Sequence, residues 1–121
     1  MTGNMTTSEQ FEKLAVCVII PTYNNEASLA TVISDVSSYN SQIIVVNDGS
    51  TDDTISIISL FPFVQLISYD KNAGKGWALR KAFKYAYGKG YKYAITIDSD
   101  GQHFAKDLPV FLEVLLEECN A

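Results

Sequence analysis

Ala15-Val16-Cys17-Val18-Ile19-Ile20 is a short apolar run, rich in β-branched residues, that stands directly before Pro21. An uninterrupted apolar run of this length is typical of a strand that is covered on both faces, because such a strand has no polar face to turn towards water. The pattern therefore predicts a buried strand over residues 15–20, ended by Pro21.

Helical and strand patterns alternate after this run. Further apolar runs predict strands over residues 42–47, 64–69 and 91–97. The helical patterns between and after the strands are centred on Leu29, Val32, Ile33 and Val36; on residues 54–61; on Leu79, Ala82, Phe83 and Ala86; and on Leu108, Phe111, Leu112, Leu115 and Leu116. Strand–helix alternation with short connections predicts an α/β fold, in which helices cover both faces of an open, mainly parallel sheet.

The composition is typical of a soluble globular domain, or of a piece of a larger one. The chain has 121 residues, 47% of them hydrophobic and 19% charged, and a net charge of −5. Residues 1–12 are polar and lack a clean period, so we expect a partly helical tail before a domain over residues 13–121. The negative charge argues against a nucleic-acid partner. No apolar run approaches the ~20 residues of a membrane span, and we expect a cytoplasmic location.

Polar segments rich in Asp, Asn and Gly follow all four predicted strands. They cover residues 21–26, 48–53, 70–76 and 98–103. In open α/β sheets, ligands bind at the carboxyl ends of the strands. We therefore expect the four segments to converge on one cleft.

Asp98 and Asp100 stand two residues apart directly after the fourth predicted strand. By itself such a pair is typical of a solvated turn. Its position at a strand end, beside other acidic loops, favours a site for Mg²⁺ or Mn²⁺, which prefer oxygen ligands. Gln102 can add a carbonyl oxygen, whereas His103, the single histidine, has no Ser or Cys beside it to indicate a hydrolase triad.

Carboxylates gathered at one edge would repel each other and any anionic ligand. At a separation of about 4 Å and an effective dielectric constant of about 20, the repulsion between two unit charges is about 4 kcal/mol. A divalent cation near Asp48, Asp98 and Asp100 would remove this repulsion and could hold a diphosphate. We therefore expect metal and phosphates to bind together.

The segments after the second and third predicted strands are less specific. Asp48 can accept hydrogen bonds from the N–H edge of a base, although a plain turn fits the same residue, and Gly49 allows a close backbone approach or a positive φ. Gly74-Lys75-Gly76 opens a helix whose amides could face an anion. It matches neither a phosphate-binding loop nor a dinucleotide fingerprint.

Four motifs occur in a fixed order along the chain. They are Pro21-Thr22-Tyr23-Asn24-Asn25-Glu26, Val46-Asn47-Asp48-Gly49-Ser50-Thr51-Asp52, Asn72-Ala73-Gly74-Lys75-Gly76 and Asp98-Ser99-Asp100-Gly101-Gln102-His103. Together they resemble the family 2 glycosyltransferases of the GT-A fold, and most of all the branch of dolichol-phosphate mannosyltransferases and related polyprenyl-phosphate sugar transferases. The resemblance implies a Rossmann-like sheet, a nucleotide-diphosphate-sugar donor (a UDP- or GDP-sugar), Mg²⁺ or Mn²⁺, and inverting transfer of a hexose.

The resemblance also implies roles for individual residues. Those implied to line the nucleotide-sugar pocket are Pro21, Tyr23, Glu26, Asp48, Lys75 and Asp98. Those implied to hold the metal are Asp98, Asp100 and Gln102. Asp48 would contact the base or ribose, Asp98 would lie near the sugar and ribose or share the metal, and Lys75 would lie near the base or phosphates.

Members of this family usually continue well beyond these motifs, and the later part holds the acceptor pocket and the general base. We therefore expect the chain to be the donor-binding half, inactive by itself, with the catalytic base beyond residue 121. The acceptor would be a polyprenyl phosphate or a growing glycan. Missing strands would leave an apolar surface and a sheet edge exposed, so we expect self-association.

Two other functions fit parts of the sequence. A Mg²⁺-dependent phosphotransferase or phosphatase would use an aspartate of Asp98-Ser99-Asp100 as nucleophile, but such enzymes usually carry this motif after the first strand and not the fourth. A non-catalytic nucleotide-binding module would bind its nucleotide whether or not metal is present.

Overall fold

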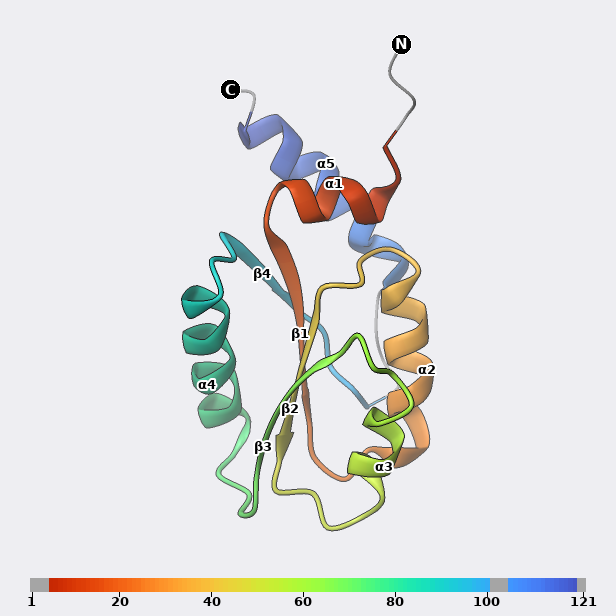
Figure 1. Ribbon diagram of the computed structural model, residues 1–121, viewed down its shortest axis with the longest axis vertical. Helices are drawn as coiled ribbons and strands as arrows, with labels where there is room; N and C mark the ends of the chain where they lie inside the picture. Colours follow the sequence, from red (N-terminus) through yellow and green to blue (C-terminus); the bar gives the residue numbers. More distant parts are fainter. Residues whose placement is uncertain (1–4, 101–104, 120–121) are drawn as a thin grey trace.

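The computed structural model describes residues 5–100 and 105–119 of the chain, and within these ranges four parallel strands form one sheet. The strands are β1 (Val16–Thr22), β2 (Ile43–Asp48), β3 (Gln65–Tyr69) and β4 (Tyr93–Thr96), in the spatial order β3-β2-β1-β4. Helices α2 (Glu26–Ser37) and α3 (Thr54–Ile58) lie on one face, and α4 (Lys75–Gly88) lies on the other (Figure 1). The predicted α/β fold with a parallel sheet is confirmed.

Strand β1 is buried along its whole length. Val16, Val18 and Ile20 belong to the core beneath α2, whereas Cys17 and Ile19 belong to a second core beneath α4. The prediction of a strand covered on both faces is therefore confirmed. The strand continues through Pro21 to Thr22, so the prediction that Pro21 ends it is wrong.

Two helices lie side by side at the end of the sheet where the strands begin. They are α1 (Thr7–Lys13) and α5 (Leu108–Cys119), and a 3₁₀ turn over Ala105–Asp107 precedes α5 (Figure 1). A capping box between Thr6 and Glu9 starts α1, and Phe11 is fully buried in the core beneath α2. The expected partial helix near the amino terminus is present, but it packs on the domain through Phe11 and is not a loose tail.

The helices differ from the predictions in two details. Helix α4 packs on the sheet through Ala78, Ala82 and Ala86, while Phe83 is 47% exposed. Ala82 and Ala86 are buried as predicted and Leu79 packs partly buried against the same core, so the prediction is wrong for Phe83 alone. Helix α3 ends at Ile58 and is therefore shorter than the predicted pattern over residues 54–61.

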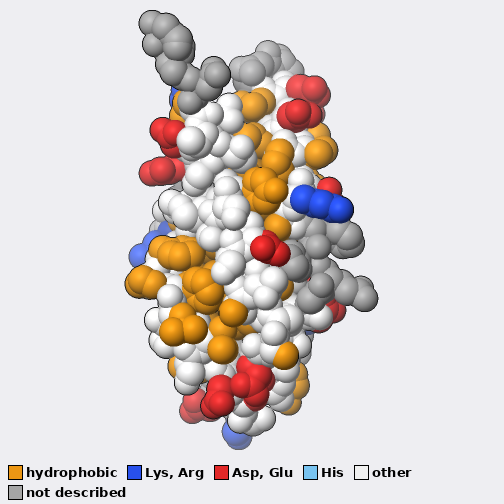
Figure 2. Space-filling model, turned by 90° about the vertical axis from the view of Figure 1, so that its right-hand side faces the viewer, with side chains coloured by type: hydrophobic (Ala, Val, Ile, Leu, Met, Phe, Trp, Pro, Cys, Tyr) orange, Lys and Arg blue, Asp and Glu red, His pale blue; other side chains and the backbone are white. Residues whose placement is uncertain are grey.

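Both edges of the sheet and one face of α5 carry exposed apolar side chains. Leu66 on β3 is 41% exposed, and Val110, Phe111 and Val114 on α5 are 47–58% exposed. Figure 2, which faces the side of the molecule where α2 lies, shows hydrophobic side chains in patches, with acidic side chains at its lower end and in its upper part. Exposed apolar surface was expected, and the self-association inferred from it stays a prediction.

None of the helices in the described part of the chain has the length and apolar character that crossing a bilayer requires.

The burial of Phe11 yields a test of how the amino-terminal segment packs. We expect Phe11→Ala to lower the free energy of unfolding by roughly 3 to 5 kcal/mol, because a fully buried aromatic side chain is lost. The exposed control Tyr87→Ala, at a side chain that is 85% exposed, should change it by less than about 0.5 kcal/mol. Urea denaturation of the three proteins measures the difference, and equal midpoints would mean that α1 does not pack on the core.

Candidate functional site

A cavity of about 330 Å³ opens at the carboxyl ends of the strands. Its walls come from all four polar segments: Pro21, Thr22, Tyr23, Asn25, Asp48, Asn72, Gly74, Lys75, Ala78, Asp98, Ser99 and Asp100. The predicted convergence of these segments on one cleft is therefore confirmed, and Asp48 and Asp100 lie on the same cavity. Of the predicted pocket residues, Glu26 does not line it; this exposed residue starts α2 beside the cleft.

Two loops hold one wall of the cleft through hydrogen bonds with each other. The Asn24 amide donates to Ser50 Oγ at 2.9 Å, and the Thr51 amide donates to Asn24 Oδ1 at 2.8 Å. Asn24 has a φ of 52°, a left-handed conformation that asparagine tolerates. These bonds fix the chain directly after Tyr23, whose side chain is 46% exposed at the wall of the cavity.

Asp52 joins the same pair of loops. Its carboxylate accepts from the Glu26 amide at 3.3 Å and from the amide and hydroxyl of Thr54. Burial acts to raise the pKa of Asp52, but the hydrogen bonds from Thr54 and Glu26 together hold the pKa below its usual value. Asp52 therefore ties the start of α2 to the start of α3.

Asp48 is 3% exposed and holds the loop that leads into α4. Its carboxylate accepts from Asn72 Nδ2 at 2.9 Å, from the Ala73 amide at 2.8 Å and from the Gly74 amide at 3.0 Å. Three of the roughly four acceptor positions of a carboxylate are thus used inside the protein. Burial, and after it the close polar contact with Asp48 and the charge of that carboxylate, raise the pKa of Tyr69. Contact of Asp48 with a base or ribose stays a prediction.

Gly49 lets this loop come close to the end of β2. It has a φ of +70°, and a Cβ at this position would lie 2.3 Å from the Asn72 nitrogen and 2.5 Å from the Lys71 carbonyl carbon. Both properties expected of Gly49, a close backbone approach and a positive φ, are confirmed.

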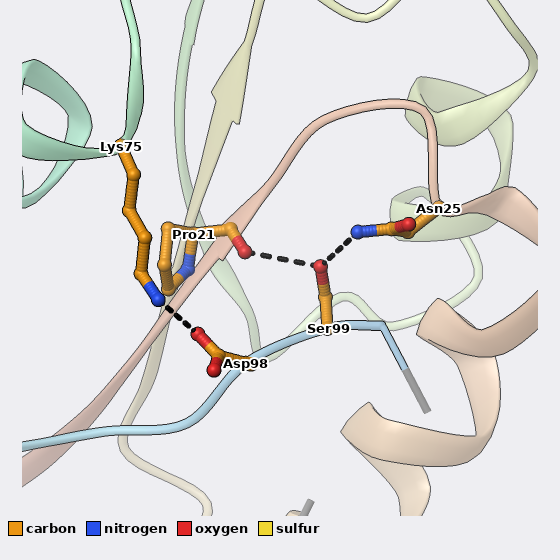
Figure 3. A network of polar contacts seen from close by, with 5 residues as sticks. All are labelled: Pro21, Asn25, Lys75, Asp98 and Ser99. Atoms are coloured by element: carbon orange, nitrogen blue, oxygen red, sulfur yellow. Dashed lines mark hydrogen bonds and ion pairs between the residues drawn. The ribbon is translucent and has the colours of Figure 1, made fainter. Parts of the chain in front are cut away.

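Lys75 and Asp98 form an ion pair across the cleft. Lys75 Nζ lies 2.5 Å from Asp98 Oδ1, and the two side chains are 60% and 52% exposed (Figure 3). Lys75 is the first residue of α4, and Gly74 before it has a φ of 97°, a conformation that favours glycine. The structure therefore brings two of the predicted site residues, from different elements, into direct contact.

Asp98 and Asp100 both line the cavity, with the buried Ser99 between them. Within residues 5–100 and 105–119, no three acidic, His or Cys side chains form a group that could hold a metal ion. Gln102 and His103 lie outside the described residues. The metal-ligand roles of Asp98, Asp100 and Gln102 stay predictions.

Pro21 explains why the chain after β4 leaves the sheet at this point. The Ile97 amide donates to the Ile19 carbonyl at 2.9 Å, so alternate residues of β1 face β4. Pro21 is two residues further on and faces the same way, but it has no N–H with which to continue the ladder. The pairing of β1 with β4 ends at Ile19 and Thr96, while the pairing with β2 continues to Thr22.

Sequence reasoning missed the polar side chains that support this site from behind. Asn25 occupies the N-cap position of α2, but its side chain makes no capping bond. It donates instead to Ser99 Oγ at 2.8 Å. Asn72 and Ser99 were read as parts of motifs and not as structural ties. Their signal in the sequence was weak, because Asn and Ser are common in any turn.

The sequence profile of the family described as "Glycosyl transferase family 2" matches residues 17–121. The chain belongs to this family.

Individual relatives carry further information. A UDP-N-acetylglucosamine–dolichyl-phosphate N-acetylglucosaminyltransferase of Methanococcus voltae is 29% identical, over 85% of this chain and 48% of its own length. A polyprenol monophosphomannose synthase of Mycolicibacterium smegmatis is 30% identical, over 81% of this chain and 40% of its own length. The chain thus spans about half the length, or less, of these curated relatives.

Among solved structures, the glucosyl-3-phosphoglycerate synthase of Mycobacterium tuberculosis is similar to this chain. Its complex with Mn²⁺, uridine diphosphate and glucosyl-3-phosphoglycerate superimposes with a TM-score of 0.71 and 26% identity. The match covers 96% of this chain and 46% of the synthase. The GT-A fold predicted from the motifs is therefore confirmed.

The close approach at Gly49 predicts that this position tolerates no side chain. We expect Gly49→Ala to lower the free energy of unfolding by roughly 2 kcal/mol or more, because of the positive φ and the collision with the Asn72 backbone. Gly76→Ala is the matched control, since a Cβ there would meet nothing within 4 Å. It should leave stability unchanged or raise it by up to about 1 kcal/mol. Thermal denaturation measures both effects. Equal midpoint temperatures of the two variants would contradict the claim that position 49 tolerates no side chain.

Proposed function

We propose that this chain binds a nucleotide-diphosphate-sugar together with a divalent cation, and that it forms the donor site of a glycosyltransferase. The observation that carries the proposal is the meeting, in one cavity, of the Asp98 and Asp100 carboxylates with the first turn of α4. The carboxylates suit a cation, and the helix start suits the phosphates that the cation would bridge. Family membership and the Mn²⁺–UDP complex of the similar synthase support the same ligand pair.

The cation fits the donor set at this edge. Asp98 already attracts a positive group, because the Lys75 ammonium lies 2.5 Å from its Oδ1. Asp100 adds a second carboxylate to the same cavity, and Gln102 would add a carbonyl oxygen. Oxygen ligands of this kind suit Mg²⁺ or Mn²⁺. When bound, such a cation would offset the negative charge that develops on the diphosphate leaving group.

The chain's own groups would hold the rest of the donor. Pro21 and Tyr23 would form the wall of the nucleoside pocket, and Asp48 would contact the base or ribose through its remaining acceptor position. The first amides of α4 lack partners within the helix and would face the diphosphate, as helix starts do for anions. Lys75 would exchange Asp98 for a phosphate oxygen.

The acceptor would be a polyprenyl phosphate. Support comes from the names of the two curated relatives, which act on dolichyl phosphate or make polyprenol monophosphomannose. A phosphate acceptor is already an anion, so this reaction makes little demand on a strong general base. The names of these relatives and of the similar synthase indicate no phosphotransferase or phosphatase, so that alternative gains no support.

Calorimetry of UDP, GDP and ADP, with Mn²⁺ or with EDTA, tests the donor site. We expect one of the diphosphates to bind at least about tenfold more tightly with Mn²⁺, because the cation removes repulsion between carboxylates and phosphates. Asp100→Ala should abolish most of this difference. Glu113→Ala, which removes an exposed carboxylate from α5, should preserve it. Equal binding of every diphosphate in EDTA and in Mn²⁺ would instead identify a non-catalytic nucleotide-binding module.

The ion pair of Lys75 predicts opposite effects on the two ligands. Lys75→Met should raise the affinity for Mn²⁺ alone by up to about fivefold, because an exposed pair that competes for Asp98 is removed. The same variant should bind the diphosphate more weakly in EDTA, because a cation near the phosphates is lost. Electron paramagnetic resonance of free Mn²⁺ and calorimetry of the diphosphate measure the two effects. Lys89→Met, at the other end of α4, is the control, and a change of both affinities in the same direction would exclude the exchange.

A further inference from the structure

Ser99 is 2% exposed, although it lies between two exposed aspartates at the mouth of the cavity. Its hydroxyl donates to the Pro21 carbonyl at 3.0 Å and accepts from Asn25 Nδ2 at 2.8 Å (Figure 3). Its own carbonyl accepts from Ser28 Oγ at 2.5 Å. One residue therefore ties the segment after β4 both to the end of β1 and to the first turn of α2.

These bonds take the place of the sheet ladder. Pro21 cannot continue the pairing of β1 with the chain after β4, so the backbone there has no ladder bond to fix it. The Ser99 hydroxyl reaches the Pro21 carbonyl that the ladder would otherwise have used. The buried Ser99 thus ties this segment to β1, while its neighbours Asp98 and Asp100 line the cavity.

Asn25 is used in a way that helix stability alone does not explain. It stands at the N-cap of α2, where an asparagine side chain ordinarily accepts from amides of the first turn. Here it makes no such bond and donates to Ser99 instead. Helix α2 therefore lacks a side-chain cap at Asn25. The bond from Asn25 to Ser99 instead contacts the segment that carries both carboxylates.

We propose that Ser99 and Asn25 are positioning residues: they hold the Asp98 and Asp100 carboxylates at the spacing at which both act on one divalent cation. This inference rests on the proposed function, because the cation is part of that proposal. Neither residue needs to touch the cation. Groups that orient metal ligands in this way typically change metal affinity by about tenfold to a hundredfold when they are removed.

The test compares wild type, Ser99→Ala, Ser99→Thr and Asn25→Ala in the full 121-residue chain. UDP and GDP are titrated with Mn²⁺ and with EDTA, and thermal midpoints are recorded. We expect Ser99→Ala and Asn25→Ala to lose about tenfold or more of the Mn²⁺-dependent gain in affinity. Binding in EDTA should change by less than about twofold, and Ser99→Thr, which keeps the hydroxyl, should retain the gain. Ser59→Ala is the control, since its hydroxyl donates to a backbone carbonyl outside the cleft.

Each outcome bears on the proposal. A Mn²⁺-dependent gain that is the same in Ser99→Ala and Asn25→Ala as in wild type would overturn the positioning role and leave the donor site standing. Equal losses with Mn²⁺ and with EDTA would also overturn it, because they indicate general damage to the cleft. If wild type itself gained nothing from Mn²⁺, the proposed function would fail, and the positioning role with it. Should Ser99→Ala not fold, Asn25→Ala carries the same comparison.

Discussion

The burial of β1 on both faces is the constraint on which the rest of the structure depends. A strand with α2 on one side, α4 on the other and a parallel partner at each edge has no free surface along its length. The chain can reach water only where the strand ends. Because its neighbours β2 and β4 run parallel to it, their carboxyl ends meet the same edge, and the polar loops accumulate there. The site is therefore a consequence of the sheet and not an addition to it.

At that edge, side chains take over the task of the backbone ladder. Backbone groups that leave a sheet below the surface still need hydrogen-bond partners. Asp48 supplies them to the amides of Ala73 and Gly74, and Asn47 Oδ1 accepts from the Ser50 amide at 3.2 Å. Ser99 does the same for the carbonyl of Pro21. Three short polar side chains thus convert diverging strand ends into a fixed wall.

The sequence was sufficient for the fold and for the location of the site. Apolar runs without polar alternation distinguish buried strands, and each run was followed by a polar segment, so the cleft could be predicted from chain order alone. Details that depend on how the side chains pack could not be predicted in this way. Periodicity predicted Leu79, Ala82, Phe83 and Ala86 as the buried face of α4, but Phe83 is exposed and Ala78 is buried in addition to Ala82 and Ala86. Phe11 was missed because a single apolar residue in a polar segment has no period to reveal it.

The same reasoning explains why the supporting residues of the site were harder to predict than its charged ones. Asp98 was recognisable because it follows a predicted strand beside other acidic loops, and Lys75 because it stands in a motif that resembles the family. Ser99 and Asn25 are ordinary turn residues by type, and their roles depend on contacts 71 to 78 positions apart in the sequence. Such contacts follow from the position of Pro21 inside β1, whereas the sequence alone predicted that Pro21 ends this strand.

Burial divides the site into two kinds of polar group. Asp48 and Ser99 are 3% and 2% exposed, and their hydrogen bonds are costly to break, because a buried polar atom without a partner loses its hydration as well. Lys75 and Asp98 are more than half exposed, and an ion pair between exposed side chains contributes little to stability. A ligand can therefore rearrange the exposed pair at small cost while the buried groups keep the cleft in shape. The exchange of Lys75 for a cation that we propose would require both properties, and the two lie next to each other in the sequence at Asp98 and Ser99.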